Sequence, residues 1–315
     1  MLCDPGAAVT PYFGLCFGMK IPISQRPNRL FCFGLGYSAG VLARALLAEG
    51  WAVAGTHHMP LAEDAAQAGV DSHHFERAHP LPCPMAALAG TSHVLLSIPP
   101  DDAGDPVLDR HGTDLAALAG LCWIGYLSTT GVYGDHGGAW VDETTPTKPS
   151  GPRQRRRVLA EQAWLEWGRS HGVAVQVFRL AGIYGPGRNV LDQLRAGTAK
   201  RIDQPGQIFS RIHVNDIAAV LRASIARPSP DTTYNVCDDL PAPAEAVVNY
   251  AAGLLGMGPP PLVPLAESGL SPMALSFHAD NKRVRNERIK RELGVVLRHP
   301  DYKSGLAAIL AAETA

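Results

Sequence analysis

Residues 30–39 read LFCFGLGYSA, a short apolar run that passes directly into a glycine-rich turn. The turn fits the pattern G-x-G-x-x-A, and helical spacing of apolar residues follows it over residues 38–49. In such a turn the first glycine allows the tight bend, and the second lets backbone N–H groups approach a pyrophosphate. The small third residue permits close helix–strand packing. We therefore predict a nicotinamide dinucleotide site formed by Gly34, Gly36, Tyr37, Ser38 and Ala39.

Apolar runs and amphipathic segments then alternate along the chain. We expect strands near residues 51–55, 93–98, 121–127, 173–180 and 233–236, and helices near 61–68, 105–118, 154–170 and 216–227. Continuous apolar runs bounded by turns suit parallel strands that are buried on both faces. The sequence thus predicts an α/β fold, a Rossmann-type doubly wound parallel sheet with a smaller C-terminal substrate lobe.

The same pattern predicts the division of the chain into domains. Residues 1–28 hold four prolines without a clear period, and we expect them to form an N-terminal extension. We expect the NAD(P)-binding Rossmann core over 29–182, with 207–238 returning to it. The substrate-side lobe is expected over 183–315, where helical pieces are broken by prolines.

Composition argues against several classes of partner. The formal net charge is -1, which gives no electrostatic reason to expect binding to nucleic acid or to an anionic membrane. The six cysteines form no C-x-x-C pair, which disfavours a zinc site or any other metal site and favours a reducing compartment. No apolar stretch reaches transmembrane length, and the N-terminus lacks the basic region of a signal peptide. We expect a cytoplasmic protein with a small-molecule substrate, and a homodimer stays open.

The end of the expected second strand bears on the choice of cofactor. NAD sites usually carry a carboxylate there to bind the ribose hydroxyls, whereas this strand ends in Gly55, Thr56, His57 and His58. A carboxylate would repel a 2′-phosphate, so its absence favours NADP over NAD. We expect Thr56 and His58 to contact the cofactor, with Ile98 and Pro99 after the third strand, although the histidines could equally be ordinary polar residues at a strand edge.

Several stretches in the same order resemble the short-chain dehydrogenase/reductase superfamily, and most closely its extended branch, the NAD-dependent epimerase/dehydratase-like proteins. They are residues 34–39, 128–134 (STTGVYG), Arg179, 183–188 (IYGPGR), 211–218 (RIHVNDIA) and 234–236 (YNV). The resemblance spans about residues 29–300. The G-x-G-x-x-A spacing departs from the usual G-x-x-G-x-x-G of that branch and is more similar to its atypical subgroups.

The resemblance implies a catalytic role for Thr129, whose hydroxyl would hold the reacting oxygen near the nicotinamide. Tyr133 and Tyr184 are expected to be packed structural residues. The family's acid/base pair, Tyr-x-x-x-Lys, is missing. With Glu161 as the anchor, Arg153 falls at the tyrosine position and Arg157 at the lysine position.

Arginine stays protonated across physiological pH and cannot exchange a proton usefully. Three interpretations of Arg153 and Arg157 remain open: binding of an anionic substrate, binding of the cofactor's ribose or phosphate, and a solvated helix start. Nucleotide-sugar 4,6-dehydratases carry Asp-Glu where this chain has Thr130 and Gly131, which disfavours that activity.

Other residues complete the expected site. The loop 135–143 could supply a substitute acid or base from Asp135, His136, Asp142 or Glu143, although a solvated loop is the simpler interpretation for each. Arg188 and Arg211 resemble family positions that face the substrate.

Two functions follow from these features. The first is an NAD(P)-binding, epimerase/dehydratase-like oxidoreductase with an atypical active site, acting on a small or nucleotide-linked carbonyl or hydroxyl compound. The alternative is a non-catalytic protein that senses a dinucleotide or binds a partner. Nucleic-acid binding through the arginine run 153–157 is a weaker third interpretation.

Overall fold

The computed structural model describes residues 28–58 and 69–314. The expected N-terminal extension, apart from its last residue, and the helix expected near 61–68 lie outside the described residues. No helix within the described ranges is long and apolar enough to cross a membrane.

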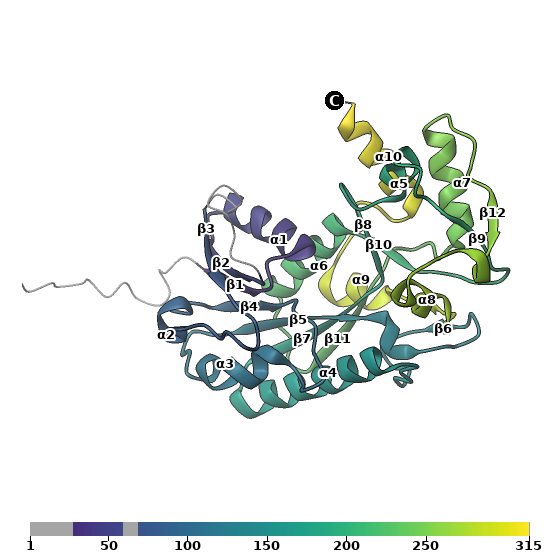
Figure 1. Cartoon of the computed structure of the whole chain (residues 1–315). Coiled ribbons are helices and arrows are strands. Elements are labelled where there is room, and N and C mark those ends of the chain that lie inside the picture. Colours follow the sequence, from purple (N-terminus) through teal and green to yellow (C-terminus); the bar gives the residue numbers. More distant parts are fainter. Residues whose placement is uncertain (1–27, 59–68, 315) are drawn as a thin grey trace, which may run out of the picture.

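The centre of the molecule is a seven-stranded sheet in the order β11-β7-β5-β4-β1-β2-β3 (Figure 1). Every neighbouring pair in it is parallel. Its strands are β1 (Arg29–Phe33), β2 (Ala52–His57), β3 (Val70–His74), β4 (His93–Leu96), β5 (Trp123–Thr129), β7 (Ala174–Leu180) and β11 (Thr232–Val236). The predicted Rossmann-type fold class is confirmed, and β11 joins the sheet from beyond residue 207.

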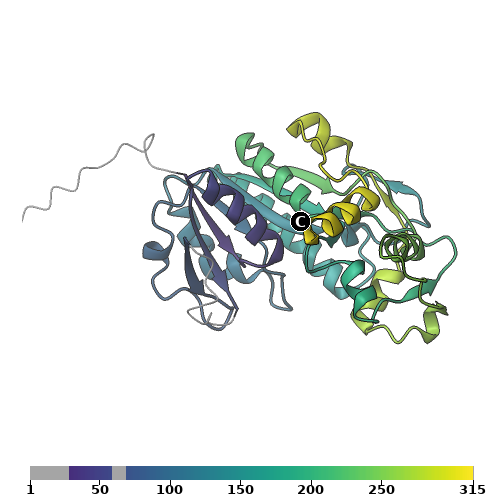
Figure 2. The same ribbon diagram turned by 90° about the horizontal axis from the view of Figure 1, so that it is seen from above.

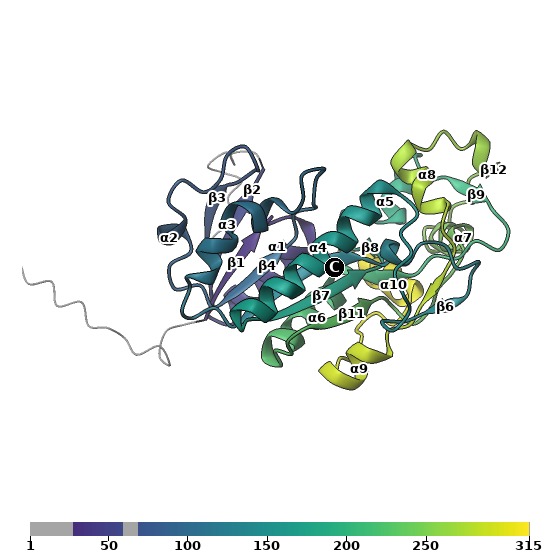
Figure 3. The same cartoon turned by 90° about the horizontal axis from the view of Figure 1, so that it is seen from below.

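Helices cover both faces of this sheet. On one face lie α1 (Tyr37–Ala48) and α6 (Val214–Ala226), seen from above in Figure 2. On the other lie α3 (Pro106–Ala116) and α4 (Pro152–His171), seen from below in Figure 3. Strand β1 shows why both faces close. Leu30 and Cys32 are buried in the core under α1 and α6, whereas Phe31 and Phe33 are buried in the core under α3 and α4.

A second part of the chain stands at the carboxyl end of the strands, on the right in Figure 1. It contains the helices α5 (Val190–Arg195), α7 (Ala244–Leu254), α8 (Pro272–His278) and α10 (Tyr302–Glu313), whereas α9 (Glu287–Leu293) packs against α6 and β11 of the sheet core. Short parallel pairs connect distant segments: β8 (Gly182–Tyr184) with β10 (Arg211–His213), β9 (Arg201–Asp203) with β12 (Leu262–Pro264), and β6 (Trp140–Val141) with β13 (Arg283–Val284). Tyr184, Leu191, Leu306 and their neighbours form its own apolar core.

Strand β3 and the short helix α2 (Pro84–Ala87) were not predicted from the sequence. The β3 sequence VDSHH is polar, and its residues are exposed or half-buried because it lies at the edge of the sheet. It forms by pairing with β2 from Val53–Val70 to His57–His74. Its formation therefore depends on pairing with β2, and no periodicity within the segment reveals it.

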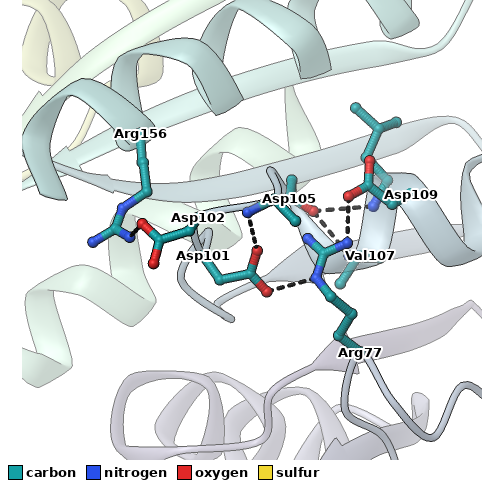
Figure 4. A network of polar contacts seen from close by, with 9 residues as sticks. Arg77, Asp101, Asp102, Asp105, Val107, Asp109 and Arg156 are labelled. Carbon is teal, nitrogen blue, oxygen red and sulfur yellow. Dashed lines mark hydrogen bonds and ion pairs between the residues drawn. The ribbon is translucent and has the colours of Figure 1, made fainter. Parts of the chain in front are cut away.

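Polar contacts fix α3 and α4 beside the strand ends (Figure 4). Asp105 caps α3: its carboxylate accepts hydrogen bonds from the backbone N–H groups of Val107 and Leu108, both at 3.0 Å. Arg77 lies between Asp101 (2.5 Å) and Asp109 (2.6 Å), and its guanidinium lowers the pKa of the Asp101 carboxyl. On α4, Arg156 forms an ion pair with Asp102, which lies next to Asp101 in the segment between β4 and α3.

A buried ion pair joins α4 to the sheet. The Arg179 guanidinium of β7 donates to Glu161 of α4 at 2.7 Å, and the two side chains are 9% and 4% exposed. Ser128 at the end of β5 donates to the same carboxylate. Arg179 also donates to the Tyr133 hydroxyl at 3.0 Å. The ion pair thus connects α4 to the carboxyl ends of β5 and β7.

Helix α6 begins at a buried histidine. The Nδ1 atom of His213 accepts a hydrogen bond from the backbone N–H of Asn215 at 3.2 Å, so His213 is the N-cap. The Asp216 carboxylate accepts from the N–H groups of Arg298 (2.7 Å) and His299 (3.0 Å). Asn215 and Asp216 are of residue types that commonly cap helices. His213 is the cap instead, because its neutral imidazole offers an acceptor at the right position.

This cap predicts a pH dependence of stability. Burial lowers the pKa of His213 from 6.5 to about 4. The folded protein keeps the ring neutral in that range while the unfolded chain protonates it, so stability is lost as the pH falls from 6.5 through about 4. His213→Asn keeps an acceptor and cannot titrate. We expect urea unfolding to show a shallower pH dependence in this variant, by at most about 1.4 kcal/mol per pH unit. Parallel curves for the two proteins would contradict this role.

Candidate active site

A cavity of about 680 Å³ opens at the carboxyl ends of the strands. In an open α/β sheet this is the edge at which ligands bind. The cavity is lined by the glycine-rich turn, the end of β5, the start of α4 and the C-terminal part of the chain. Residues from these four regions that line it include Gly36, Thr129, Arg153, Arg157, Arg211 and Lys282.

The glycine-rich turn has the geometry that a pyrophosphate requires. Gly34 has φ 89°, and a Cβ there would lie 2.6 Å from the Ser97 hydroxyl oxygen, so only glycine fits. A Cβ at Gly36 would meet nothing within 4 Å, so this face of the turn is open to a ligand. Gly36 is also the N-cap of α1 and offers no side chain to its first N–H groups, which leaves them for an anion. Gly36, Tyr37, Ser38 and Ala39 all line the cavity.

The expected adenosine-side residues are placed less directly. Thr56 is buried beneath the turn, where its hydroxyl accepts a hydrogen bond from the Gly34 N–H at 2.9 Å. This position suits a residue that shapes the turn better than one that binds a phosphate. His58 is exposed, and its Nδ1 lies 3.4 Å from Glu76. Glu76, which the sequence did not single out, brings a carboxylate near the end of β2. The side chain of Ile98 packs against Gly34, and Pro99 follows it in the loop after β4.

Thr129 lies where the family motif predicts. It ends β5, lines the cavity, and caps the short 3₁₀ helix η3 (Thr130–Tyr133) by accepting a hydrogen bond from the Gly131 N–H at 3.1 Å. Because the hydroxyl acts there as an acceptor, its own proton stays available for donation to a ligand oxygen.

Tyr133 and Tyr184 are packed, as expected. The Tyr133 hydroxyl donates to Asn235 at 2.8 Å and accepts from Arg179, and burial raises its pKa to about 12. The Tyr184 hydroxyl donates to the Asp301 carbonyl at 3.2 Å. Neither side chain is placed to exchange a proton with a ligand in the cavity.

The arginine side chains at the start of α4 point in two directions. Arg153 and Arg157 line the cavity, one turn of helix apart, whereas Arg156 points to Asp102 (Figure 4). Arg157 is anchored beneath β5: it donates to the Leu127 carbonyl at 2.9 Å and to the Tyr126 hydroxyl at 3.1 Å. Arg153 is exposed, and its guanidinium lies 5.7 Å from the centre of the Phe277 ring. The interpretation of these arginines as a solvated helix start therefore fits Arg153 only in part. It does not fit Arg157, whose side chain is held by hydrogen bonds.

The loop 135–143 does not provide an acid or base to this cavity. Asp135 accepts from the N–H groups of Asn281 and Gly137, and Asp142 accepts from Thr144. Glu143 accepts from the Asn235 N–H at 2.7 Å, and the His136 ring contacts the Tyr133 carbonyl at 3.1 Å. In the described chain, none of these four side chains lines the cavity.

Arg188 and Arg211 do line the cavity, as expected. The Arg188 guanidinium lies 5.7 Å from the centre of the Tyr37 ring, beside the glycine-rich turn. Arg211 is held by the carbonyl groups of Phe209 (2.9 Å) and Ala242 (3.0 Å). Asp280 and Lys282 also line it and were missed, because no motif marks them and only the fold brings them to this edge.

Comparisons with known proteins agree with this fold. A family model described as the NAD dependent epimerase/dehydratase family matches residues 114–237. Protein YeeZ of Escherichia coli (strain K12) is 30% identical over 282 residues, which are 85% of this chain and 95% of that protein. A conserved protein of unknown function from Silicibacter pomeroyi DSS is 50% identical, with a TM-score of 0.83, over 90% of this chain and 99% of that one.

A more distant solved structure supports the fold alone. The dTDP-glucose 4,6-dehydratase from Bacillus anthracis str. Ames, solved in complex with NAD, has a TM-score of 0.70 at 16% identity. The match covers 91% of this chain and 96% of that one.

Proposed function

The chain belongs to the NAD dependent epimerase/dehydratase family, and from this premise we propose that it is an NAD(P)-dependent oxidoreductase or epimerase-like enzyme without the Tyr-x-x-x-Lys pair. The observation that carries the proposal is that a single cavity joins the glycine-rich turn to Thr129 and to Arg157. A bound nicotinamide would exchange a hydride with a carbonyl or hydroxyl carbon. In this proposal the core over 29–182, with 207–238, binds the cofactor, and residues 183–315 hold the substrate.

The side chains of this proposal have separate tasks. The free N–H groups at the start of α1 bind the pyrophosphate, and Thr129 donates its hydroxyl proton to the substrate oxygen. Arg157 occupies the position of the family's lysine and keeps a fixed positive charge beside the site. Because an arginine stays protonated, it can stabilise negative charge on an oxygen but cannot donate a proton to it.

We propose NADP as the preferred cofactor. This choice rests on the residues at the end of β2. No carboxylate follows Gly55 within β2, so nothing on that strand repels a 2′-phosphate. The Glu76 carboxylate lies 3.4 Å from His58 and would favour NAD, because its charge repels a 2′-phosphate. Titrating the protein with each cofactor measures the two affinities. A tighter complex with NAD than with NADP would reverse the assignment.

Thr129→Val tests the catalytic part of the proposal. The variant keeps the side-chain shape and loses the hydroxyl. We expect reduction of a responsive carbonyl compound to slow by about 100-fold, the usual effect of removing one donor to a developing oxyanion. Affinity for NADP should change little. The exposed Thr198→Val is the matched control and should retain full activity.

The assay follows oxidation of the reduced cofactor across a panel of carbonyl compounds. Equal rates for Thr129→Val and Thr198→Val would contradict the role of Thr129. Tight cofactor binding without turnover of any compound would instead favour the second candidate, a non-catalytic dinucleotide sensor. Arg153 and Arg157 at the acid/base positions support that candidate, which further predicts association with a partner protein only when the nucleotide is bound.

A further inference from the structure

Lys282 is a buried cation that the family's motifs do not include. It precedes β13, lines the cavity, and its side chain is 10% exposed. Its Nζ atom donates to the Gly134 carbonyl at 2.9 Å and lies 3.7 Å from the Asp280 carboxylate. Asp280 in turn accepts a hydrogen bond from the Ser150 hydroxyl at 3.1 Å. An ammonium has three hydrogens to donate, so this arrangement leaves donor capacity facing the cavity.

The distance along η3 indicates which part of a ligand Lys282 can reach. Thr129 caps the start of this 3₁₀ helix, and Gly134, which binds Lys282, follows its end. At about 2 Å per residue, the two ends are ~10 Å apart. This backbone separation argues that Lys282 contacts a group other than the oxygen that Thr129 contacts, and so favours a role in recognition over proton transfer.

A second cation of the lining, Arg211, belongs to a segment that runs beside the segment of Lys282. Two segments run next to each other here, because the Ile208 N–H donates to the Asn281 side chain (3.2 Å) and the Val284 N–H donates to the Ser210 hydroxyl (3.1 Å). Lys282 falls between these two contacts. The guanidinium of Arg211, from the neighbouring segment, lies 5.8 Å from the centre of the Phe209 ring.

Charge in the cavity is strongly one-sided. Its lining carries the cations Arg153, Arg157, Arg188, Arg211 and Lys282. Asp280 is the single carboxylate among the described lining residues, and Lys282 already faces it. The cavity lining therefore carries an excess of positive charge, which suits an anionic ligand.

We propose that Lys282, together with Arg211, binds an oxyanion of the substrate, a carboxylate or a phosphate, at the end of the cavity away from the reacting carbon. The proposal rests on the proposed function for the identity of the cavity as the substrate site. Burial lowers the pKa of the Lys282 ammonium, and a bound anion would offset that cost by supplying the opposite charge. Substrates that carry an acidic group are thereby selected over neutral analogues.

Calorimetry with inorganic phosphate and with succinate tests this site in the protein saturated with NADP, which covers the glycine-rich turn. Lys282→Met keeps the apolar stem and removes the charge. We expect its affinity for the anion to fall by at least about tenfold. Lys282→Arg should restore most of the affinity, and Lys303→Met, at an exposed lysine of α10, should leave it unchanged. Whichever anion binds more tightly identifies the acidic group.

Asp280→Asn gives a result of opposite sign. It removes the carboxylate that faces Lys282, so anion affinity should rise by several-fold. This variant tests the role of Lys282 if Lys282→Met does not fold. The proposal is overturned if neither anion binds the wild-type protein, or if Lys282→Met and Lys303→Met bind it equally. NADP titrations separate this outcome from failure of the proposed function, because Lys282→Met should bind NADP as the wild type does.

Discussion

Arg179→Met is expected to lower the free energy of unfolding by about 3–5 kcal/mol, the usual cost of removing one partner of a buried ion pair. The variant leaves the Glu161 carboxylate buried with the Ser128 hydroxyl as its donor, and the Tyr133 hydroxyl loses the guanidinium. The loss is large because the pair joins α4, β5 and β7 at a place that water does not reach.

The matched control is Arg169→Met. Arg169 forms ion pairs with Glu166 and Asp231, all three at the surface, so its removal should cost less than about 1 kcal/mol. The double variant Glu161→Met with Arg179→Met should recover much of the lost stability, because no buried charge is left alone. Urea unfolding measures all three. Equal losses for the two single arginine variants would contradict the structural role assigned to the buried pair.

Gly36→Val is expected to weaken cofactor binding by roughly 100-fold or more while leaving the fold intact. A Cβ at this position meets nothing within 4 Å, and φ is -92°, so the backbone accepts valine without strain. The side chain would instead occupy the space in front of the α1 N–H groups. Loss of two hydrogen bonds to a charged phosphate, at about 1.5–3 kcal/mol each, accounts for the effect.

Gly34→Ala is the contrasting variant, because it should damage folding and not only binding. Its φ is 89°, and the added Cβ would lie 2.6 Å from the Ser97 hydroxyl oxygen. Thermal unfolding and cofactor titration together distinguish the two glycines. If Gly36→Val binds the cofactor as tightly as the wild type does, the turn is not the pyrophosphate site.

The parts of the fold that the sequence predicts are those with local causes. Strands such as β5 are mainly apolar because both faces are covered, and α3 begins at Asp105 and Pro106, residue types that favour a helix start. β3, β8 and the pair β9–β12 were not predicted, because each forms only by pairing with another segment of the chain. Their sequences carry no period of their own.

The candidate site divides in the same way. The spacing of known motifs identified Thr129 and the two arginines of α4, which the structure brings to one cavity. Lys282 could not be found, since its contact with Gly134 spans 148 residues and depends on how the C-terminal part folds back. Thr56 lies beneath the turn, where it shapes the site and does not face the ligand. Residue type alone does not distinguish these two roles.

Isothermal titration of the purified wild-type protein with NADP and with NAD tests the central claim most directly, since it asks whether the α1 N-terminus holds a dinucleotide. We predict saturable binding of one cofactor per chain, with NADP the tighter of the two and with the heat lost in Gly36→Val. Absence of heat with both nucleotides, from protein whose folding is verified in the same sample, would contradict the account.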